Sequence, residues 1–194
     1  NFPNQWSTLQ KTETNNVDTT YGGSSAFSWL ERDPRQVILF AGYPFSKEYN
    51  DDRGHMNALE DVRNTDRLNL NADDPKRTPG TCYSCKSSNN PALWDELTMT
   101  EFDKMSFMEI GARIEEPIGC ANCHEAETMR LIVTNPALDE ALKAQGKDWT
   151  TFTRQEMRTV VCANCHVEYY FKGDGKYLTF PWAKGTNIDQ IIAY

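Results

Sequence analysis

Hydrophobic side chains in residues 91–113 recur every three or four positions, which is the period of an α-helix. They are Leu93, Trp94, Leu97, Phe102, Met105 and Met108. Such a stripe is more often part of a core than a surface for a partner, so we expect one helical face packed into the interior.

Residues typical of helix ends mark three further helices. Residues 135–146 carry Asn at the expected N-cap, Pro at the first helical position and Gly just past the end. Thr153 and Glu156 form a capping-box pattern that predicts a helix running towards Cys162. Residues 186–187 predict the start of a last helix, because isoleucines follow them at helical spacing.

One β-hairpin is expected near the end of the chain. Residues 167–171 and 176–180 have the composition of strands, and Gly-Asp-Gly lies between them.

The first residues follow a different pattern. Residues 1–26 are polar and lack apolar periodicity, which predicts an extended N-terminal arm wrapped around a body formed by residues 27–194. The apolar segment 30–45 predicts a short helix, with Asp33 as its N-cap and Pro34 as its first residue.

Composition indicates that side chains alone do not form the core. Hydrophobic residues make up 39% of the 194 residues, whereas about 45–50% is usual. The 5 Trp, 8 Tyr and 9 Phe residues nevertheless argue against disorder. A net charge of -8 argues against a nucleic-acid partner, and no apolar run is long enough to span a bilayer.

The six cysteines form three C-x-x-C pairs, which are Cys82/Cys85, Cys120/Cys123 and Cys162/Cys165. Two pairs are followed at once by histidine, at His124 and His166. C-x-x-C-H is the attachment sequence of c-type haem, in which the thiols bind the porphyrin and the histidine binds the iron. The expected fold is therefore a mainly α multihaem cytochrome c with a haem-packed core, short helices and one small β-hairpin.

Zinc, an iron–sulfur cluster and disulfides are the alternatives for these cysteines. Zinc sites usually join C-x-x-C pairs about 12–20 residues apart, whereas the gaps here are 34 residues (86–119) and 38 residues (124–161). Disulfides within three such short loops would constrain little of the chain.

Lys86 follows the first pair at the position where histidine follows the other two. Alone, Cys-Tyr-Ser-Cys-Lys would indicate a redox or zinc pair beside a surface lysine. Next to two haem-attachment sequences, it indicates a third haem whose iron is bound by the lysine amine. An amine with a pKa of about 10.4 must lose its proton to bind a metal, so we expect a special role for this haem.

The chain holds three histidines, which are His55, His124 and His166. Two haems with two histidine ligands each would need four, so at least one haem lacks a second histidine from this chain. His55 could serve one haem or could be a surface residue, and a methionine or an open position could serve another. A lysine-bound haem with an open face would be a substrate site.

These motifs resemble the pentahaem, ammonia-forming cytochrome c nitrite reductases. The resemblance rests on Cys-Tyr-Ser-Cys-Lys followed by two C-x-x-C-H sites, and on the further stretches 33–46, 53–55, 61–65 and 162–171. It covers about residues 27–194 and roughly the amino-terminal half of the family's length. Octahaem relatives share the lysine motif.

The resemblance implies the iron ligands. Lys86 would bind the iron of the active-site haem, and His124 and His166 would bind those of the second and third haems. His55 would be the distal ligand of the third haem.

The resemblance also implies residues around the substrate. Arg67 matches the active-site arginine, with Arg63 as its rival one helical turn earlier, and Tyr169 matches the active-site tyrosine. Glu168 and the carbonyl of Tyr169 match two calcium ligands. A guanidinium suits an anion such as nitrite, and oxygen ligands suit calcium. Without the family, Arg67 is a solvated charge and Glu168 begins an amphipathic strand.

The implied function is that of an oxidoreductase that reduces nitrite to ammonium at the lysine-bound haem, in the bacterial periplasm. The implied cofactors are three haem c groups and calcium. The implied partners are a cytochrome or quinol-oxidising membrane protein as electron donor, and further copies in a homo-oligomer. The competing hypothesis is a non-enzymatic trihaem electron-transfer protein in which every iron is six-coordinate.

The family needs five haems and a catalytic histidine, whereas this chain holds three attachment sites. The helical pattern near the end also stops at Tyr194 in mid-period. We therefore expect a fragment, or one half of a split enzyme, whose activity needs the remaining half or a second chain.

Overall fold

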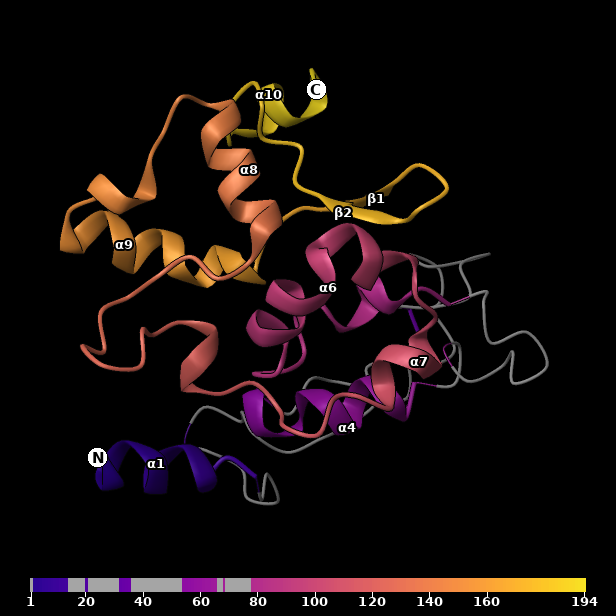
Figure 1. Ribbon diagram of the computed structural model, residues 1–194, viewed down its shortest axis with the longest axis vertical. Coiled ribbons are helices and arrows are strands. Elements are labelled where there is room, and N and C mark those ends of the chain that lie inside the picture. Colours follow the sequence, from indigo (N-terminus) through magenta and orange to yellow (C-terminus); the bar gives the residue numbers. More distant parts are fainter. Residues whose placement is uncertain (1, 14–19, 21–31, 36–53, 66–67, 69–77) are drawn as a thin grey trace. The chain divides into compact units, whose positions relative to one another are not determined.

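The computed structural model describes residues 2–13, 20, 32–35, 54–65, 68 and 78–194 (Figure 1). It divides into two compact units, residues 1–77 and residues 78–194. All three cysteine pairs belong to the second unit. The boundary predicted from the sequence, between an arm of residues 1–26 and a trihaem region of residues 27–194, falls outside the described residues and stays a prediction.

The first unit contains α1 (Pro3–Gln10), and η2 (His55–Asn57), which runs into α4 (Ala58–Arg63). The expected extended arm is thus helical at its start. Pro3 occupies the first turn, where its fixed φ favours a helix and its missing N–H is not needed. None of the side chains of α1 is buried. The helix therefore has no periodic pattern of apolar residues from which it could be predicted.

Only residues 32–35 of the segment 30–45, in which we expected a short helix starting at Pro34, are described. There, the carboxylate of Asp33 accepts a hydrogen bond from the backbone N–H of Arg35 at 3.1 Å and pairs with its guanidinium at 2.8 Å. Residues 34–35 form a turn, and the rest of the segment lies outside the described residues.

The second unit is described throughout and is mainly helical. Its helices are α6 (Asn90–Lys104), α7 (Phe107–Gly111), α8 (Pro136–Ala144), α9 (Arg154–Val160) and α10 (Ile188–Ile192). Short 3-10 turns are η3 (Gly80–Tyr83), η4 (Cys120–Asn122), η5 (Trp149–Thr151) and η6 (Val161–Asn164). An antiparallel hairpin pairs β1 (Tyr170–Lys172) with β2 (Tyr177–Thr179). The predicted fold of short helices with one small hairpin is confirmed.

The expected helix ends at 135, 153 and 187 are confirmed. Asn135 accepts from the N–H of Ala137 at 3.0 Å, and the capping boxes of Thr153 and Asn187 are both formed. Gly146 has a φ of +70°, the left-handed conformation in which glycine commonly ends a helix.

The stretch 91–113 is not one helix, contrary to the hydrophobic period. α6 kinks at Thr98, where φ is +59°, and ends at Met105, whose backbone is extended. α7 begins after Ser106, which forms a capping box with Glu109. The strands of the hairpin are likewise shorter than expected, so that residues 167–169 precede β1.

The helices α6 and α8 pack against β2, and α6 and α7 pack against η3, so the apolar core of the second unit lies among α6, α7, α8 and β2. Phe102, Ile110, Leu138 and Leu178 come one from each of these elements, and each exposes 2% or less of its surface. Among the described residues, no helix is both long and apolar enough to cross a bilayer.

The first cysteine pair starts from this core. The N–H of Gly80 donates to the carbonyl of Met105 at 2.7 Å. A Cβ added at Gly80 would lie 2.6 Å from the carbonyl oxygen of Phe102, so this close approach requires glycine. Tyr83, inside the pair, stacks on Phe107 with ring centroids 4.1 Å apart.

Asp103 is an ionisable side chain buried in this core, with no exposed surface. Its Oδ2 accepts a hydrogen bond from the N–H of Leu178 at 2.8 Å, which joins α6 to β2, while Oδ1 has no partner. Burial raises the pKa of Asp103 to about 7, although the hydrogen bond from Leu178 acts in the opposite direction.

We predict that stability falls as the pH rises from about 4 to 7. In that range, folded Asp103 keeps a proton that the unfolded chain, with a pKa of 3.8, has released. Asp103→Asn keeps an oxygen for Leu178 but cannot titrate, so the variant should lose this dependence, worth up to about 4 kcal/mol. Thermal unfolding of both haem-loaded proteins across this range is the measurement, and parallel curves would contradict the prediction.

Candidate haem-binding and catalytic site

The second and third cysteine pairs form the same tight turn. In the second pair, the N–H groups of Cys123 and His124 both donate to the carbonyl of Cys120, at 3.1 and 2.8 Å. In the third, the corresponding bonds to the carbonyl of Cys162 are 3.2 and 2.9 Å. The repeated sequence Cys-Ala-Asn-Cys-His therefore gives a repeated backbone shape, which presents a histidine immediately after two thiols.

The first pair forms a different turn. The N–H of Lys86 donates to the carbonyl of Tyr83 at 2.9 Å, three residues back rather than four. The side chain of Lys86 is half-buried, and no carboxylate pairs with its ammonium group among the described residues.

The six cysteines fit covalent haem attachment better than the alternatives. All six thiols are free, so the structure does not support disulfides. No three His, Cys, Asp or Glu side chains gather around one point in the described part of the chain, as a four-cysteine zinc site would require. The chain instead offers three pairs of thiols, two of them followed by histidine as in the attachment sequence of haem c and one followed by lysine.

The first and third pairs meet at Cys85 and Cys165. Their thiols are close enough to shift each other's pKa, and Cys85 Sγ lies 4.0 Å from the carbonyl oxygen of Asn164. The neighbouring thiol of Cys165 lowers the pKa of the Cys85 thiol. The thiol of Cys85, together with burial, raises the pKa of Cys165. Groups attached to these two pairs would therefore adjoin.

Two buried asparagines that the sequence analysis did not single out join the turns. Asn122, in the second pair, donates from Nδ2 to the carbonyl of Ser87 at 2.8 Å, one residue beyond Lys86. Asn164, in the third pair, donates from Nδ2 to the carbonyl of Asn122 at 3.4 Å. The available signal was the repeated Ala-Asn inside both C-x-x-C-H sequences.

The ring of His124 is oriented by a small loop behind it. Its Nδ1 lies 2.7 Å from the carbonyl oxygen of Met129, a bond that leaves Nε2 available for iron. The backbone of Met129 has a φ of +59°, and in this left-handed conformation its carbonyl faces the ring of His124. Glu125 supports the loop by accepting from the N–H groups of Glu127 and Thr128, and its pKa is lowered to about 2, chiefly by the Thr128 hydroxyl.

Glu168 and Tyr169 lie between the third pair and β1, and both are exposed. The ring centroid of Tyr169 is 5.7 Å from that of Phe171, and 55% of the residue is exposed. Within the described residues, Glu168 belongs to no group of three side chains that could hold a metal. Its assignment to calcium stays a prediction.

The remaining predicted site residues belong to the first unit or its undescribed part. His55 begins η2 directly after Gly54, whose φ is +92°, and is exposed. Arg63 ends α4, and Arg67 lies outside the described residues. Their roles therefore stay predictions.

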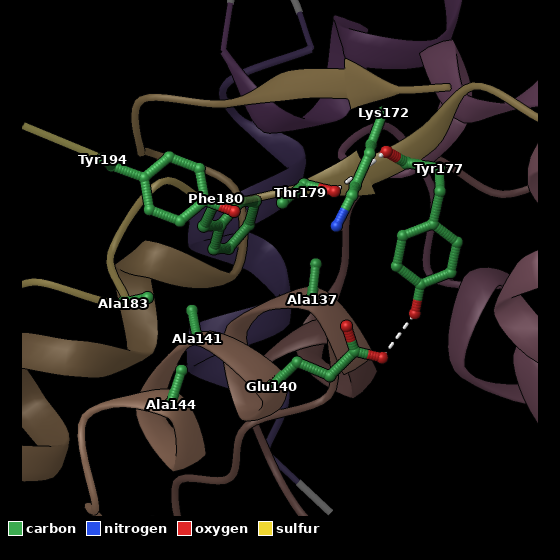
Figure 2. Close-up of a pocket in the computed structure, with 10 residues that line it drawn as sticks. All are labelled: Ala137, Glu140, Ala141, Ala144, Lys172, Tyr177, Thr179, Phe180, Ala183 and Tyr194. Carbon is green, nitrogen blue, oxygen red and sulfur yellow. Dashed lines mark hydrogen bonds between the residues drawn. The ribbon is translucent and has the colours of Figure 1, made fainter. Parts of the chain in front are cut away.

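A cavity of about 180 Å³ in the second unit lies apart from these turns (Figure 2). Alanines of α8 form one wall, and the hydroxyl of Tyr177 donates to the carboxylate of Glu140 at its edge. No cysteine, and none of Lys86, His124 and His166, lines it.

Thiol pairs with adjacent nitrogen ligands, set close together in a fold of short helices, define a multihaem c-type cytochrome. The chain belongs to the cytochrome c552 family, because the sequence model of that family matches residues 1–194. It is 48% identical to cytochrome c-552 of Parabacteroides distasonis over 100% of this chain and 40% of that protein. It is 44% identical to cytochrome c-552 of Aliarcobacter butzleri over 85% of this chain and 35% of that protein.

The fold also matches a solved structure, the catalytic subunit of cytochrome c nitrite reductase from Desulfovibrio desulfuricans, which is described as having two calcium sites. The TM-score is 0.87 and the identity 36%, over 100% of this chain and 44% of that one. The chain thus spans about two fifths of the length of the curated relatives named here.

We predict that Glu125→Ala raises the reduction potential of the haem at the second pair by about 40 mV. Loosening the loop weakens the bond from His124 to Met129, which otherwise makes the imidazole a stronger donor and favours ferric iron. The size follows from about 1 kcal/mol for one hydrogen bond and 59 mV per 1.4 kcal/mol. Spectroelectrochemistry measures the potential.

Met129→Gly is the matched control for this experiment. It keeps the carbonyl that His124 uses and suits the positive φ of +59°, so the potential should stay unchanged. An equal shift in both variants, or in neither, would show that the loop does not control the ligand.

Proposed function

We propose that this chain is the catalytic-haem part of an ammonia-forming cytochrome c nitrite reductase. The observation that carries the proposal is Lys86, which stands at the histidine position of a haem-attachment sequence, next to two ordinary C-x-x-C-H sites. The likeness of the whole chain to a nitrite reductase structure, at 36% identity, supports it.

The residues of this chain have distinct tasks in that reaction. Haem, when attached to the three cysteine pairs, supplies the redox chemistry. Lys86 binds iron through its neutral Nζ, so its ammonium proton leaves when the site assembles. His124 and His166 would hold the irons of the two neighbouring haems, which would supply a route for electrons to the lysine site.

The substrate is held by charge and hydrogen bonds. Arg67 binds nitrite through a guanidinium that stays charged at every working pH. The hydroxyl of Tyr169 donates a hydrogen bond to a nitrite oxygen and relays protons. In the complete reaction, nitrite takes up six electrons and eight protons to give ammonium and two molecules of water.

The resemblance supports further assignments. His55 serves as the distal ligand of the third haem, and Glu168 with the carbonyl of Tyr169 binds calcium. The protein works in the periplasm as a homo-oligomer and receives electrons from a cytochrome or a quinol-oxidising membrane protein. Activity requires the remaining part of the enzyme, since this chain holds three haem-attachment sites.

The test compares Lys86→His with wild type in the haem-loaded, full-length protein. Ammonium formed from nitrite with a reduced viologen is the readout. We expect a loss of about tenfold or more, at least as large as the effect of removing an outer partner of a metal ligand. Lys104→His, in an exposed lysine of α6, is the control and should leave the rate unchanged.

Two results would overturn the proposal. One is full nitrite turnover by Lys86→His with haem attached at the first pair. The other is a reduced wild-type protein that forms no ammonium and binds neither cyanide nor nitrite, which would favour a trihaem electron carrier.

A further inference from the structure

The three cysteine turns are linked in a circuit by two asparagine side chains and one contact at a cysteine sulfur. Asn122 connects the second turn to Ser87 beside the first, and Asn164 connects the third turn to the second. The first and third turns also meet directly, because Cys85 Sγ in the first turn lies 4.0 Å from the carbonyl oxygen of Asn164. Every one of these bonds links residues at least 35 positions apart in the sequence.

Both asparagine side chains are buried, with 5% and 3% of the residue exposed, and each uses both ends of its amide. Asn122 Oδ1 accepts from the N–H of Gly119 at 2.9 Å. Asn164 Oδ1 accepts from the N–H groups of Thr134 and Asn135, at 3.1 and 3.0 Å. A buried amide with all its bonds formed fixes its neighbours, because breaking any bond leaves a polar group unsatisfied.

Other residues support the same circuit. Asn135 donates from Nδ2 to the carbonyl of Asn164 at 2.7 Å, and the hydroxyl of Thr134 donates to the carbonyl of Asn122 at 2.7 Å. The cap of α8 and the second and third turns therefore share one hydrogen-bonded centre.

We propose that Asn122 and Asn164 are positioning residues that set the separation of the three haem-attachment turns, and so the rate at which electrons reach the group held by Lys86. The inference rests on the proposal that haem is attached at these turns, and not on nitrite being the substrate. Each transfer moves one electron, so that one haem is oxidised as the next is reduced. The rate depends steeply on the distance between them.

The test uses Asn122→Asp and Asn164→Asp in the haem-loaded protein. This substitution keeps the shape and the accepting oxygen but replaces the donating amide by an oxygen that repels the facing carbonyl. Intact mass first counts the attached haems. The spin–spin interactions in the EPR spectrum of the oxidised protein then report haem separation, and rapid mixing with dithionite times the arrival of electrons at the lysine-bound haem.

Asn89→Asp is the matched control. The side chain of Asn89 uses Oδ1 to accept from the N–H groups of Glu115 and Glu116, at 3.1 and 2.9 Å, and from the hydroxyl of Ser87 at 3.1 Å. Its Nδ2 donates to none of the described residues. The change therefore adds the same negative charge three residues from Lys86 and keeps the oxygen that accepts all three bonds.

We expect all variants to keep their haems. Asn122→Asp and Asn164→Asp should change the EPR interactions and slow electron arrival about tenfold or more, since misplacements of about 1 Å cost up to roughly a hundredfold in positioned reactions. Asn89→Asp should match wild type in both readouts. Wild-type spectra and rates in the two circuit variants would overturn the inference.

If the two aspartate variants fail to acquire haem, Thr134→Val decides. It is nearly isosteric and removes the hydroxyl bond to Asn122 while keeping the backbone bond to Asn164. A slower rate with full haem content supports the inference, and an unchanged rate overturns it. Absence of haem from the wild-type turns would instead refute the proposed function.

Discussion

Hydrogen bonds from buried asparagine side chains to main-chain carbonyls hold the three cysteine turns of this chain together. The polar centre formed by Asn122, Asn135 and Asn164 is almost closed to solvent, with 1–5% of each residue exposed. In such surroundings a satisfied amide bond is strong and an unsatisfied one is costly, so the turns have one stable arrangement. This explains how a chain with only 39% hydrophobic residues holds its three cysteine turns in fixed positions relative to one another.

The apolar core anchors the first of the three turns, which contains Cys82 and Cys85. Gly80 allows residues 78–80 to approach α6 and α7 closely, and Tyr83 stacks on Phe107. The lysine-bearing turn is thus fixed by packing on one side and by the bond from Asn122 on the other. The histidine-bearing turns rely chiefly on polar contacts, and the loop at Met129 orients the ring of His124.

Similarity to the Desulfovibrio desulfuricans enzyme extends over this whole chain, with a TM-score of 0.87. Two sequences that share 36% of their residues therefore share the arrangement of short helices around the cysteine turns. Lys86 gives that arrangement its chemical asymmetry. Under the proposed function, an amine would have to be neutral to bind iron, whereas imidazole in general is a good iron ligand near neutral pH.

The sequence by itself determined the features that depend on neighbouring residues. These are the three cysteine pairs with the lysine or histidine that follows each, the helix caps at Asn135, Thr153 and Asn187, and the existence of the hairpin. It failed where the hydrophobic period continues through a helix break, at Met105, and where a helix without buried side chains forms, in α1. Tertiary structure alone decided that Cys85 lies against Cys165 and that two asparagines join the turns. Residues 35 or more positions apart leave no mark on local sequence patterns, because only the folded chain brings their polar groups together.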